Sequence, residues 1–390
     1  MYDLAIIFAL YGCETINVLA LGPIVPFLLV HYGVITNLND SSLYSGYFSA
    51  IYYIGQFICN IPFERIADKY GKKNVILFGT ATTIMCNMLF AFSDNLYTSL
   101  LIRFVYGLLN ANFCLLRIFI SEISSKDTVA RNYGYITCAW AIGAFIAPLT
   151  SMTYTEAAKY PALYPLCISS LITLIIFIVA FSFLDNPPKH SASTEASSGD
   201  IEMGNETANP QPIALISIIC VAIYLLFSAT EIIYSEISAV LFVSQNYKYT
   251  ERQISLIFTA NNFAGFITSL FFDKIEKFAT KEKLLCTCII IINFMLLSIT
   301  CTSNFPLIMA FTSIRMIMSN WAFSVIFVYL SEMTNMSKLN SISQTLGSLI
   351  KILFPIIFTN IFHYLGNNVN VIFIIIVCIS MSILFIANRR

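Results

Sequence analysis

The feature that most constrains this chain is a series of continuous apolar runs, each roughly 20 residues long. A helix of about 20 residues spans the hydrocarbon core of a bilayer, which is about 30 Å thick. Backbone amides find no water in that core, so only helices or a closed barrel can cross it. Because the runs are continuous and do not alternate between apolar and polar residues, they predict membrane-spanning helices.

Composition supports a lipid environment and excludes several other classes. Hydrophobic residues make up 58% of the chain, charged residues 11%, and the mean hydropathy is +0.78. Soluble domains carry about 25% charged residues, so this chain cannot cover itself with polar surface. The net charge of zero gives no sign of a nucleic-acid partner. The 11 cysteines lie mostly inside apolar runs without a C-x-x-C pair, which is typical of small buried side chains.

Twelve apolar runs predict an all-α membrane protein with twelve transmembrane helices in two pseudo-symmetric six-helix bundles. The first run contains Glu14 and Asn17 and has no basic segment before it, so we expect a spanning helix and not a cleaved signal peptide. Residues 185–212 are rich in Ser, Pro, Gly and acidic residues and predict a disordered cytoplasmic linker between bundles 1–184 and 213–390. The predicted spans are 4–30, 43–66, 75–93, 97–122, 131–154, 162–184, 213–243, 251–272, 283–302, 305–332, 340–365 and 368–388.

Basic residues predict the orientation, because cytoplasmic loops carry an excess of Lys and Arg. Fourteen basic residues fall on one side of the membrane and three on the other, which predicts that both termini are cytoplasmic. The outer three are Lys159, Lys248 and Arg252, and the inner set is Arg65, Lys69, Lys72, Lys73, Lys126, Arg131, Lys189, Lys274, Lys277, Lys281, Lys283, Lys338, Arg389 and Arg390.

The two predicted halves repeat each other at an offset near 212 residues. Arg103 opens the fourth span and Arg315 the tenth, and the same spans close on Glu122 and Glu332. Parallel halves with a binding site at their interface, near the bilayer midplane, are a transporter architecture.

Four motifs resemble those of the major facilitator superfamily. Residues 64–73 read ERIADKYGKK, similar to the signature G-x-x-x-D-R-x-G-R-K, with Glu64 in place of the leading glycine. Residues 22–27 resemble the family's first-helix proline motif, 103–107 its R-x-x-x-G motif, and 143–148 a shortened form of its antiporter motif. The resemblance implies two six-helix halves and secondary transport by alternating access.

Two further segments resemble the zinc-induced facilitator-like branch of the drug:proton antiporters. These are residues 227–237 in the seventh predicted span and 107–123 in the fourth. The resemblance implies export of a small solute in exchange for protons.

The loop motif also has a physical interpretation. The resemblance implies that Asp68 lies beside the N-terminus of the eleventh helix near Ser341, where the helix dipole stabilises a carboxylate. Gly71 permits a tight turn. Lys72 and Lys73 would face anionic lipid, and the alternative, which we favour for the lysines, is that they only set the orientation of the chain. The conformational latch is assigned to Asp68, Lys69, Gly71, Lys72 and Arg103.

Charges inside the predicted spans are the strongest pointers to function, since such residues are costly in a membrane. Arg103, Asn110 and Arg117 recur every seven residues and would share one face of a continuous helix, either lining a cavity or extending towards an interface. Glu14 lies mid-span with Asn17 one turn away. A carboxyl group in a low dielectric can load and release a proton near neutral pH.

The second half supplies further charges. Glu231 and Glu236 are five residues apart and would point about 140° apart, so they do not form a dyad. For each carboxylate, a structural ion pair is the alternative to proton coupling. Lys351 is the expected counter-charge of the second half, on one face with Gln344 and Ser348. The predicted proton-coupling and substrate residues are Glu14, Asn17, Asn110, Arg117, Glu231, Glu236 and Lys351.

The sequence therefore predicts a multi-pass secondary transporter of a small organic solute, with proton-coupled export as the leading mode. The alternatives are a gradient-independent uniporter and a substrate-sensing receptor that does not cycle. The three histidines are isolated, and neither an H-E-x-x-H motif nor a P-loop is present, so we expect no metal, no cofactor and no enzyme activity. The expected partners are the solute, protons and the bilayer, with the chain acting as a monomer.

Overall fold

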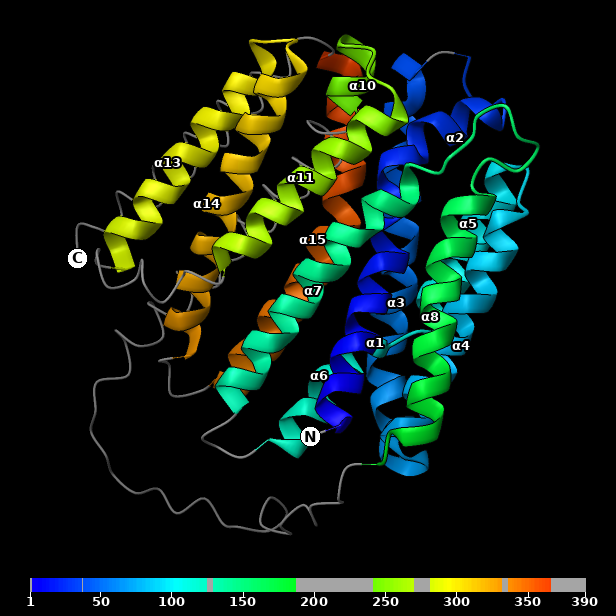
Figure 1. Ribbon diagram of the computed structural model, residues 1–390, viewed down its shortest axis with the longest axis vertical. Coiled ribbons are helices and arrows are strands. Elements are labelled where there is room, and N and C mark those ends of the chain that lie inside the picture. Colours follow the sequence, from blue (N-terminus) through cyan, green and yellow to red (C-terminus); the bar gives the residue numbers. More distant parts are fainter. Residues whose placement is uncertain are drawn as a thin grey trace.

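A computed structural model describes residues 2–36, 38–124, 129–186, 241–269, 281–331 and 336–365, and every structural statement below concerns these residues. They form helices and connecting turns with no strand among them, so the all-α prediction is confirmed. Figure 1 shows the long helices running side by side along the long axis of the molecule. The predicted span 368–388 lies outside the described residues, as do most of span 213–243 and of the predicted linker.

The first six predicted spans correspond to eight helical segments. They are α1 (Tyr2–Leu19), α2 (Val25–His31), α3 (Ser42–Tyr70), α4 (Lys72–Ala91), α5 (Leu96–Leu108), α6 (Asn112–Ile123), α7 (Val129–Ser151) and α8 (Leu163–Phe183), with short turns of helix at η1 (Gly22–Ile24) and η2 (Leu38–Ser41). The described helices of the second half are α10 (Val243–Asn246), α11 (Glu251–Ser269), α13 (Lys281–Thr300), α14 (Phe305–Ser331) and α15 (Met336–Leu365).

Five of the described segments are long and apolar enough to cross a membrane by length and composition. They are Tyr2–His31, Lys72–Ala91, Leu96–Ile120, Leu163–Phe183 and Lys283–Thr300. The other long helices carry more polar residues, yet α3 with 29 residues and α15 with 30 exceed the length that a bilayer requires.

Two predicted spans are broken helices. Pro23 and Pro26 lie in the first turns of η1 and α2, where a proline needs no amide partner, and they separate α2 from α1. The fourth span is interrupted at residues 109–111, where the Asn110 side chain accepts a 2.8 Å hydrogen bond from the Asn112 amide. This local bond competes with helix geometry. The prediction of one continuous helix, with Arg103, Asn110 and Arg117 on one face, is therefore wrong.

Glycines allow α3 and α5 to approach closely. A Cβ atom on Gly107 would lie 2.1 Å from the Tyr52 carbonyl oxygen, and one on Gly55 would lie 2.5 Å from the Phe104 carbonyl oxygen. Small residues at such contacts are typical of helix packing in membranes. The contact brings the α5–α6 break close to the middle of α3.

Helices of the first half pack against helices of the second half at two places, α3 against α15 and α7 against α11. In the second contact, the Phe145 and Phe263 rings pack with centroids 5.3 Å apart and planes tilted by 39°. In the first, Gly46 lies against Pro355 and Thr359.

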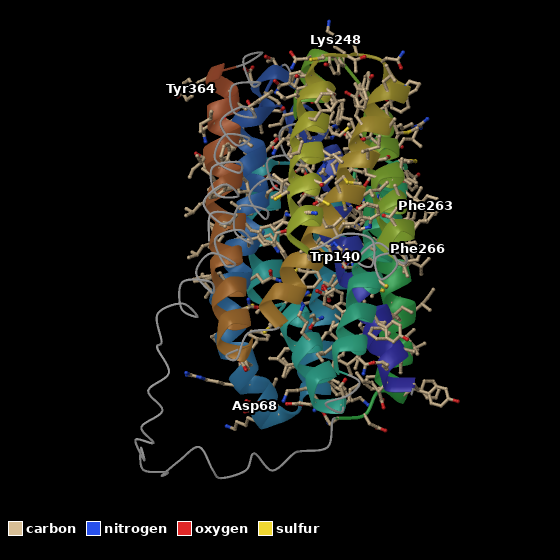
Figure 2. All side chains as sticks on the ribbon, turned by 90° about the vertical axis from the view of Figure 1, so that its left-hand side faces the viewer. Asp68, Trp140, Lys248, Phe263, Phe266 and Tyr364 are labelled. Atoms are coloured by element: carbon tan, nitrogen blue, oxygen red, sulfur yellow. The ribbon has the colours of Figure 1, made fainter. Side chains whose placement is uncertain are left out.

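Figure 2 places Lys248 and Tyr364 at one end of the bundle and Asp68 at the other, and we name the two ends after Lys248 and Asp68. Near the Lys248 end, one buried hydrophobic core combines residues of 21–166 with residues of 241–362. The core at the Asp68 end draws its described residues from 6–184 alone. Hydrogen bonds of 3.4 Å from Ser42 to His363 and from Gln245 to Ser41 also join distant segments at the Lys248 end.

Candidate functional site

The centre of the candidate site is the carboxylate of Glu14, which lies in α1 and is 1% exposed. Asn112 donates a hydrogen bond of 2.6 Å to Oε1, and Asn110 donates one of 2.8 Å to Oε2. Tyr106 and Thr83 donate weaker bonds, each 3.3 Å at its shortest. All of these described partners are neutral donors, so the carboxylate is satisfied by hydrogen bonds instead of an ion pair.

The break in the fourth span explains how two asparagines reach one carboxylate. In a continuous helix, residues two positions apart point about 200° apart and cannot meet on one side. The turn at residues 109–111 redirects the chain, so Asn110 and Asn112 both face Glu14. Their amides also donate to Thr83 at 2.7 Å and to Thr80 at 3.1 Å, which ties the break to α4.

Asn17 lies in α1, one turn from Glu14, in a separate buried network. Its amide donates to the Thr173 hydroxyl at 2.8 Å, and its oxygen accepts a 2.6 Å bond from Asn87. These bonds join α1 to α8 and α4 inside the first half. The structure therefore places Asn17 in a link between helices and not on an open surface, since it is 0% exposed.

Arg103 and Arg117 occupy different environments on either side of the break. Arg103 is buried, with its guanidinium 5.3 Å from the Phe48 ring centroid and 5.6 Å from that of Tyr52. Phe48 and Asp68 are 20 residues apart on α3, or about 30 Å of helix. Arg103 is thus remote from the loop motif with which it was grouped.

Arg117, on α6, contacts Tyr11 of α1. Its guanidinium lies 5.7 Å from the Tyr11 ring centroid and donates to the phenol oxygen at 2.7 and 3.1 Å. Lys351, on α15, lies 5.4 Å from the ring centroid of Tyr53 on α3, so it contacts the first half of the molecule through an aromatic ring.

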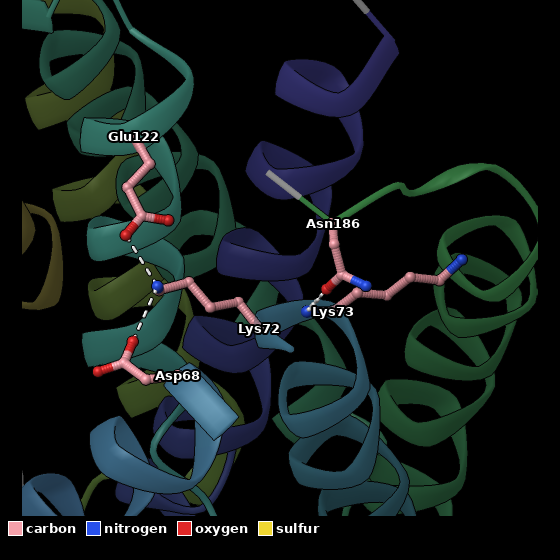
Figure 3. A network of polar contacts seen from close by, with 5 residues as sticks. All are labelled: Asp68, Lys72, Lys73, Glu122 and Asn186. Carbon is pink, nitrogen blue, oxygen red and sulfur yellow. Dashed lines mark hydrogen bonds and ion pairs between the residues drawn. The ribbon is translucent and has the colours of Figure 1, made fainter. Parts of the chain in front are cut away.

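The loop motif forms an ionic cluster at the Asp68 end, shown in Figure 3. The Lys72 ammonium lies 3.1 Å from Asp68 and 2.8 Å from Glu122, at the end of α6. Its side chain is only 11% exposed, so the prediction that Lys72 faces lipid is wrong. The contact of Asp68 with Ser341 stays a prediction, because the Ser341 side chain lies outside the described residues.

The other residues of the motif shape the turn. Gly71 has φ +91°, a conformation that other residues rarely adopt, and it joins α3 to α4. The Lys73 amide donates to Asn186 at 3.0 Å, while Lys69 lies 5.3 Å above the ring of its neighbour Tyr70.

Sequence reasoning missed several polar residues of the site: Thr80, Thr83, Tyr106, Asn112 and Glu122. Asn110 and Asn112, two amide side chains separated by one residue inside an apolar run, were a usable signal that the helix breaks there and that a polar side chain faces the break. Glu231 and Glu236 lie outside the described residues, as do the side chains of Gln344 and Ser348.

A bundle of membrane-length helices with a buried carboxylate at a helix break is typical of a polytopic membrane transporter. The sequence profile of the Major Facilitator Superfamily matches residues 7–237, and the chain belongs to this family. Solved structures agree on the fold: the D-xylose-proton symporter has a TM-score of 0.76 at 12% identity and covers 98% of this chain and 96% of its own. The human organic anion transporter MFSD10 has a TM-score of 0.72 at 13% identity and covers 98% of both chains.

Curated relatives support the branch that the motifs indicated. Protein ZINC INDUCED FACILITATOR-LIKE 1 of Arabidopsis thaliana is 26% identical over 164 residues, 42% of this chain and 34% of that protein. The multidrug transporter mfsB of Aspergillus fumigatus is 26% identical over 50% of this chain and 34% of its own. The quinolone resistance protein NorA of Staphylococcus aureus strain MSSA476 is 24% identical over 70% and 67%. The match thus spans about a third of the length of the first two relatives, and all three are named for transport or resistance, not for an enzyme activity.

Proposed function

We propose that this chain is a secondary active transporter that exports a small organic solute in exchange for protons, with Glu14 as the proton carrier. The observation that carries the proposal is the environment of Glu14. Its carboxylate is fully buried among Asn112, Asn110, Tyr106 and Thr83, with no cation among its described partners. Such a group can be neutral or charged without losing an ion pair, and both forms keep hydrogen bonds.

One contact between the two parts of the chain bears on alternating access. Near the Lys248 end, which is extracellular in the predicted orientation, one hydrophobic core combines residues of 21–166 with residues of 241–362. Transport requires that the Lys248 end open while residues 1–184 and 213–390 rock against each other as two six-helix bundles, with the chain acting as a monomer.

The test uses the purified full chain in liposomes that contain a trapped pH indicator. Three probes share one ring system: naphthalene-2-sulfonate, naphthalene-2-sulfonamide and the quaternary (2-naphthylmethyl)trimethylammonium, and protein-free liposomes give the passive permeation of each. A proton gradient should drive uphill movement of at least one probe, and the probe in turn should move protons. Glu14→Gln should abolish both effects, because an amide cannot exchange a proton, while downhill exchange of the probe persists.

Glu156→Gln is the matched control, because Glu156 is exposed and lies outside the site. It should transport like the unaltered chain. Flux that ignores the gradient would instead indicate a uniporter, and binding without flux a receptor. Full gradient-driven transport by Glu14→Gln would exclude Glu14 as the carrier.

A further inference from the structure

The hydrogen bonds around Glu14 all run in one direction, from a neighbour to the carboxylate. Asn112 donates to Oε1 at 2.6 Å and Asn110 donates to Oε2 at 2.8 Å. The hydroxyls of Tyr106 and Thr83 donate at 3.3 Å. Four donors suit an ionised carboxylate, which only accepts. A protonated Glu14 carries an O–H group that must itself find an acceptor, because an unpaired donor in a buried site is costly.

The two hydroxyls are poorly placed to be that acceptor. The Thr83 oxygen already accepts a 2.7 Å hydrogen bond from Asn110 and lies 3.3 Å from Oε1 of Glu14. The Tyr106 oxygen lies 3.3 Å from Oε2. Hydrogen bonds between two oxygens are usually about 2.7–2.8 Å long. An acid proton that faced either hydroxyl would therefore be held more weakly than one that faced Asn112.

The amide oxygen of Asn112 is an acceptor without a partner. Asn112 is 0% exposed, and none of the described residues donates to its Oδ1 atom. Its Nδ2 atom makes both side-chain contacts, 2.6 Å to Oε1 of Glu14 and 3.1 Å to Oγ1 of Thr80. A buried polar atom without a hydrogen bond is rare in folded proteins and calls for an explanation.

A half-turn of the amide about its Cβ–Cγ bond exchanges the oxygen and the nitrogen. Oδ1 would then face Oε1 of Glu14 and the hydroxyl of Thr80, which now donates to the Ile76 carbonyl at 2.9 Å and can turn. Nδ2 would face Gly79, where a Cβ atom would crowd the amide. The present orientation leaves Oδ1 unpaired, and the other gives up both Nδ2 bonds. Neither orientation satisfies the whole amide, so a proton on Glu14 can decide between them.

Asn110 offers the same chemical group but is fixed in one orientation. Its Oδ1 accepts the backbone amide of Asn112 at 2.8 Å, while its Nδ2 donates to Glu14 and to Thr83. A half-turn would place Nδ2 against that backbone N–H and break all three bonds. Asn110 therefore donates to Glu14 in either protonation state, which makes the two asparagines a matched pair.

The other titratable or charged groups around Glu14 share one property, which is that none of them hydrogen-bonds to Oδ1 of Asn112. The described side chains of α4, α7 and α8 that contact the carboxylate include no titratable group. The groups in question are Cys13 of α1, Tyr52 of α3, Tyr106 of α5, Arg103 of α5 beside Tyr52, and Arg117 of α6 beside Tyr11.

From this geometry we propose that Asn112 stabilises both protonation states of Glu14: its amide donates to the carboxylate and, after a half-turn, accepts from the carboxylic acid. One proton joins Oε1, an O–H···O bond replaces an N–H···O bond, and no other covalent bond changes. This inference rests on the proposed role of Glu14 as proton carrier. The half-turn also breaks the bond from Nδ2 to Thr80, one of the two side-chain bonds that tie the start of α6 to α4.

The test is infrared difference spectroscopy of the purified full chain, labelled with [4-13C]asparagine and recorded between alkaline and acidic buffer. The carboxylic-acid C=O band that is lost in Glu14→Gln reports protonation of Glu14. One labelled asparagine C=O band should move to lower frequency with the same midpoint pH, because an unbonded amide oxygen then accepts a strong hydrogen bond. This shift should be absent in Glu14→Gln and in Asn112→Ala.

The two asparagines are then compared by the midpoint pH of the Glu14 acid band. Asn110→Ala removes a donor that favours the charged form and should raise the midpoint by about one pH unit, a tenfold change in proton affinity. Asn112→Ala should raise it by less than half as much, since both protonation states lose a bond. If Asn112 only donated, its shorter bond would make its effect at least equal to that of Asn110.

Two results would overturn the proposal alone: a Glu14 acid band that titrates while every asparagine band stays still, or a midpoint shift in Asn112→Ala as large as in Asn110→Ala. The spectrum of the unaltered chain decides by itself if either alanine variant fails to elute as a monodisperse peak. The absence of any titrating Glu14 band would overturn the proton-carrier role as well, and the two failures are therefore distinguishable.

Discussion

The Nδ2 atom of Asn112 lies 2.6 Å from Oε1 of Glu14, and this hydrogen bond joins the first residue of α6 to the middle of α1. It exists because the fourth membrane segment breaks at residues 109–111 and restarts in a new direction. The buried carboxylate and the broken helix are therefore parts of one arrangement, and neither is explained without the other.

Removing the Asn112 amide should destabilise the protein. Asn112→Ala deletes a donor to a buried carboxylate and should lower the free energy of unfolding by about 1–3 kcal/mol. The cost should be smaller in a Glu14→Gln background, because the bond then loses its charge. Thermal unfolding in detergent measures both values, with exposed Asn74→Ala as the control. An equal cost in the two backgrounds would show that Asn112 does not act through the charge of Glu14.

Gly107 should tolerate no side chain. A methyl group at this position would meet the Tyr52 carbonyl at 2.1 Å, a backbone atom that cannot turn away, so Gly107→Ala should push α5 from α3. We expect a lower yield of monodisperse protein and a loss of at least about 1–3 kcal/mol of stability. Gly22→Ala is the matched control, because nothing lies within 4 Å of a Cβ there. Equal behaviour of the two variants in size-exclusion chromatography would contradict the close contact.

The ionic cluster at the Asp68 end should depend on salt. Lys72→Gln leaves Asp68 and Glu122 without their shared cation and should cost about 1 kcal/mol or less, since both carboxylates are partly exposed. The difference from the unaltered chain should shrink in 1 M salt, where the Debye length is about 3 Å. Lys73→Gln should have little effect, because Lys73 takes part through its backbone amide. The measurement is the unfolding midpoint at low and high salt, and a deficit that does not change with salt would argue against the ion pairs.

Opening of the Lys248 end can be tested with a metal bridge. The Ser42 hydroxyl lies 3.4 Å from Nδ1 of His363, so Ser42→Cys should place a thiolate and an imidazole where Cd²⁺ can bind both. Micromolar Cd²⁺ should then stop transport by holding α3 against α15, and a chelator should restore it. Ser42→Cys combined with His363→Ala controls for binding to the thiol alone. Undiminished transport by Ser42→Cys in saturating Cd²⁺ would mean that this contact does not open during the cycle.

Much of the fold could be predicted, because hydrophobic length is a local property. The predicted spans 43–66 and 75–93 correspond to α3 and α4, with boundaries shifted by a few residues. The motif at residues 64–73 indicated the family without any knowledge of contacts. The site was predicted less completely. Glu14 was identified from its cost in a membrane, but its partners Thr83, Tyr106 and Asn112 were not, since they lie 69 to 98 residues away along the chain.

The sequence by itself determined the solvent, the helical class and the family of this protein, since these follow from continuous apolar runs and from a short motif. Only the tertiary structure decided which polar groups meet. Lys72 pairs with Glu122 instead of facing lipid, Arg103 lies apart from the loop motif, and Asn112 meets Glu14. The physical reason is that a side chain's direction depends on helix breaks and on the helices packed around it, and residue spacing reports direction only while a helix continues.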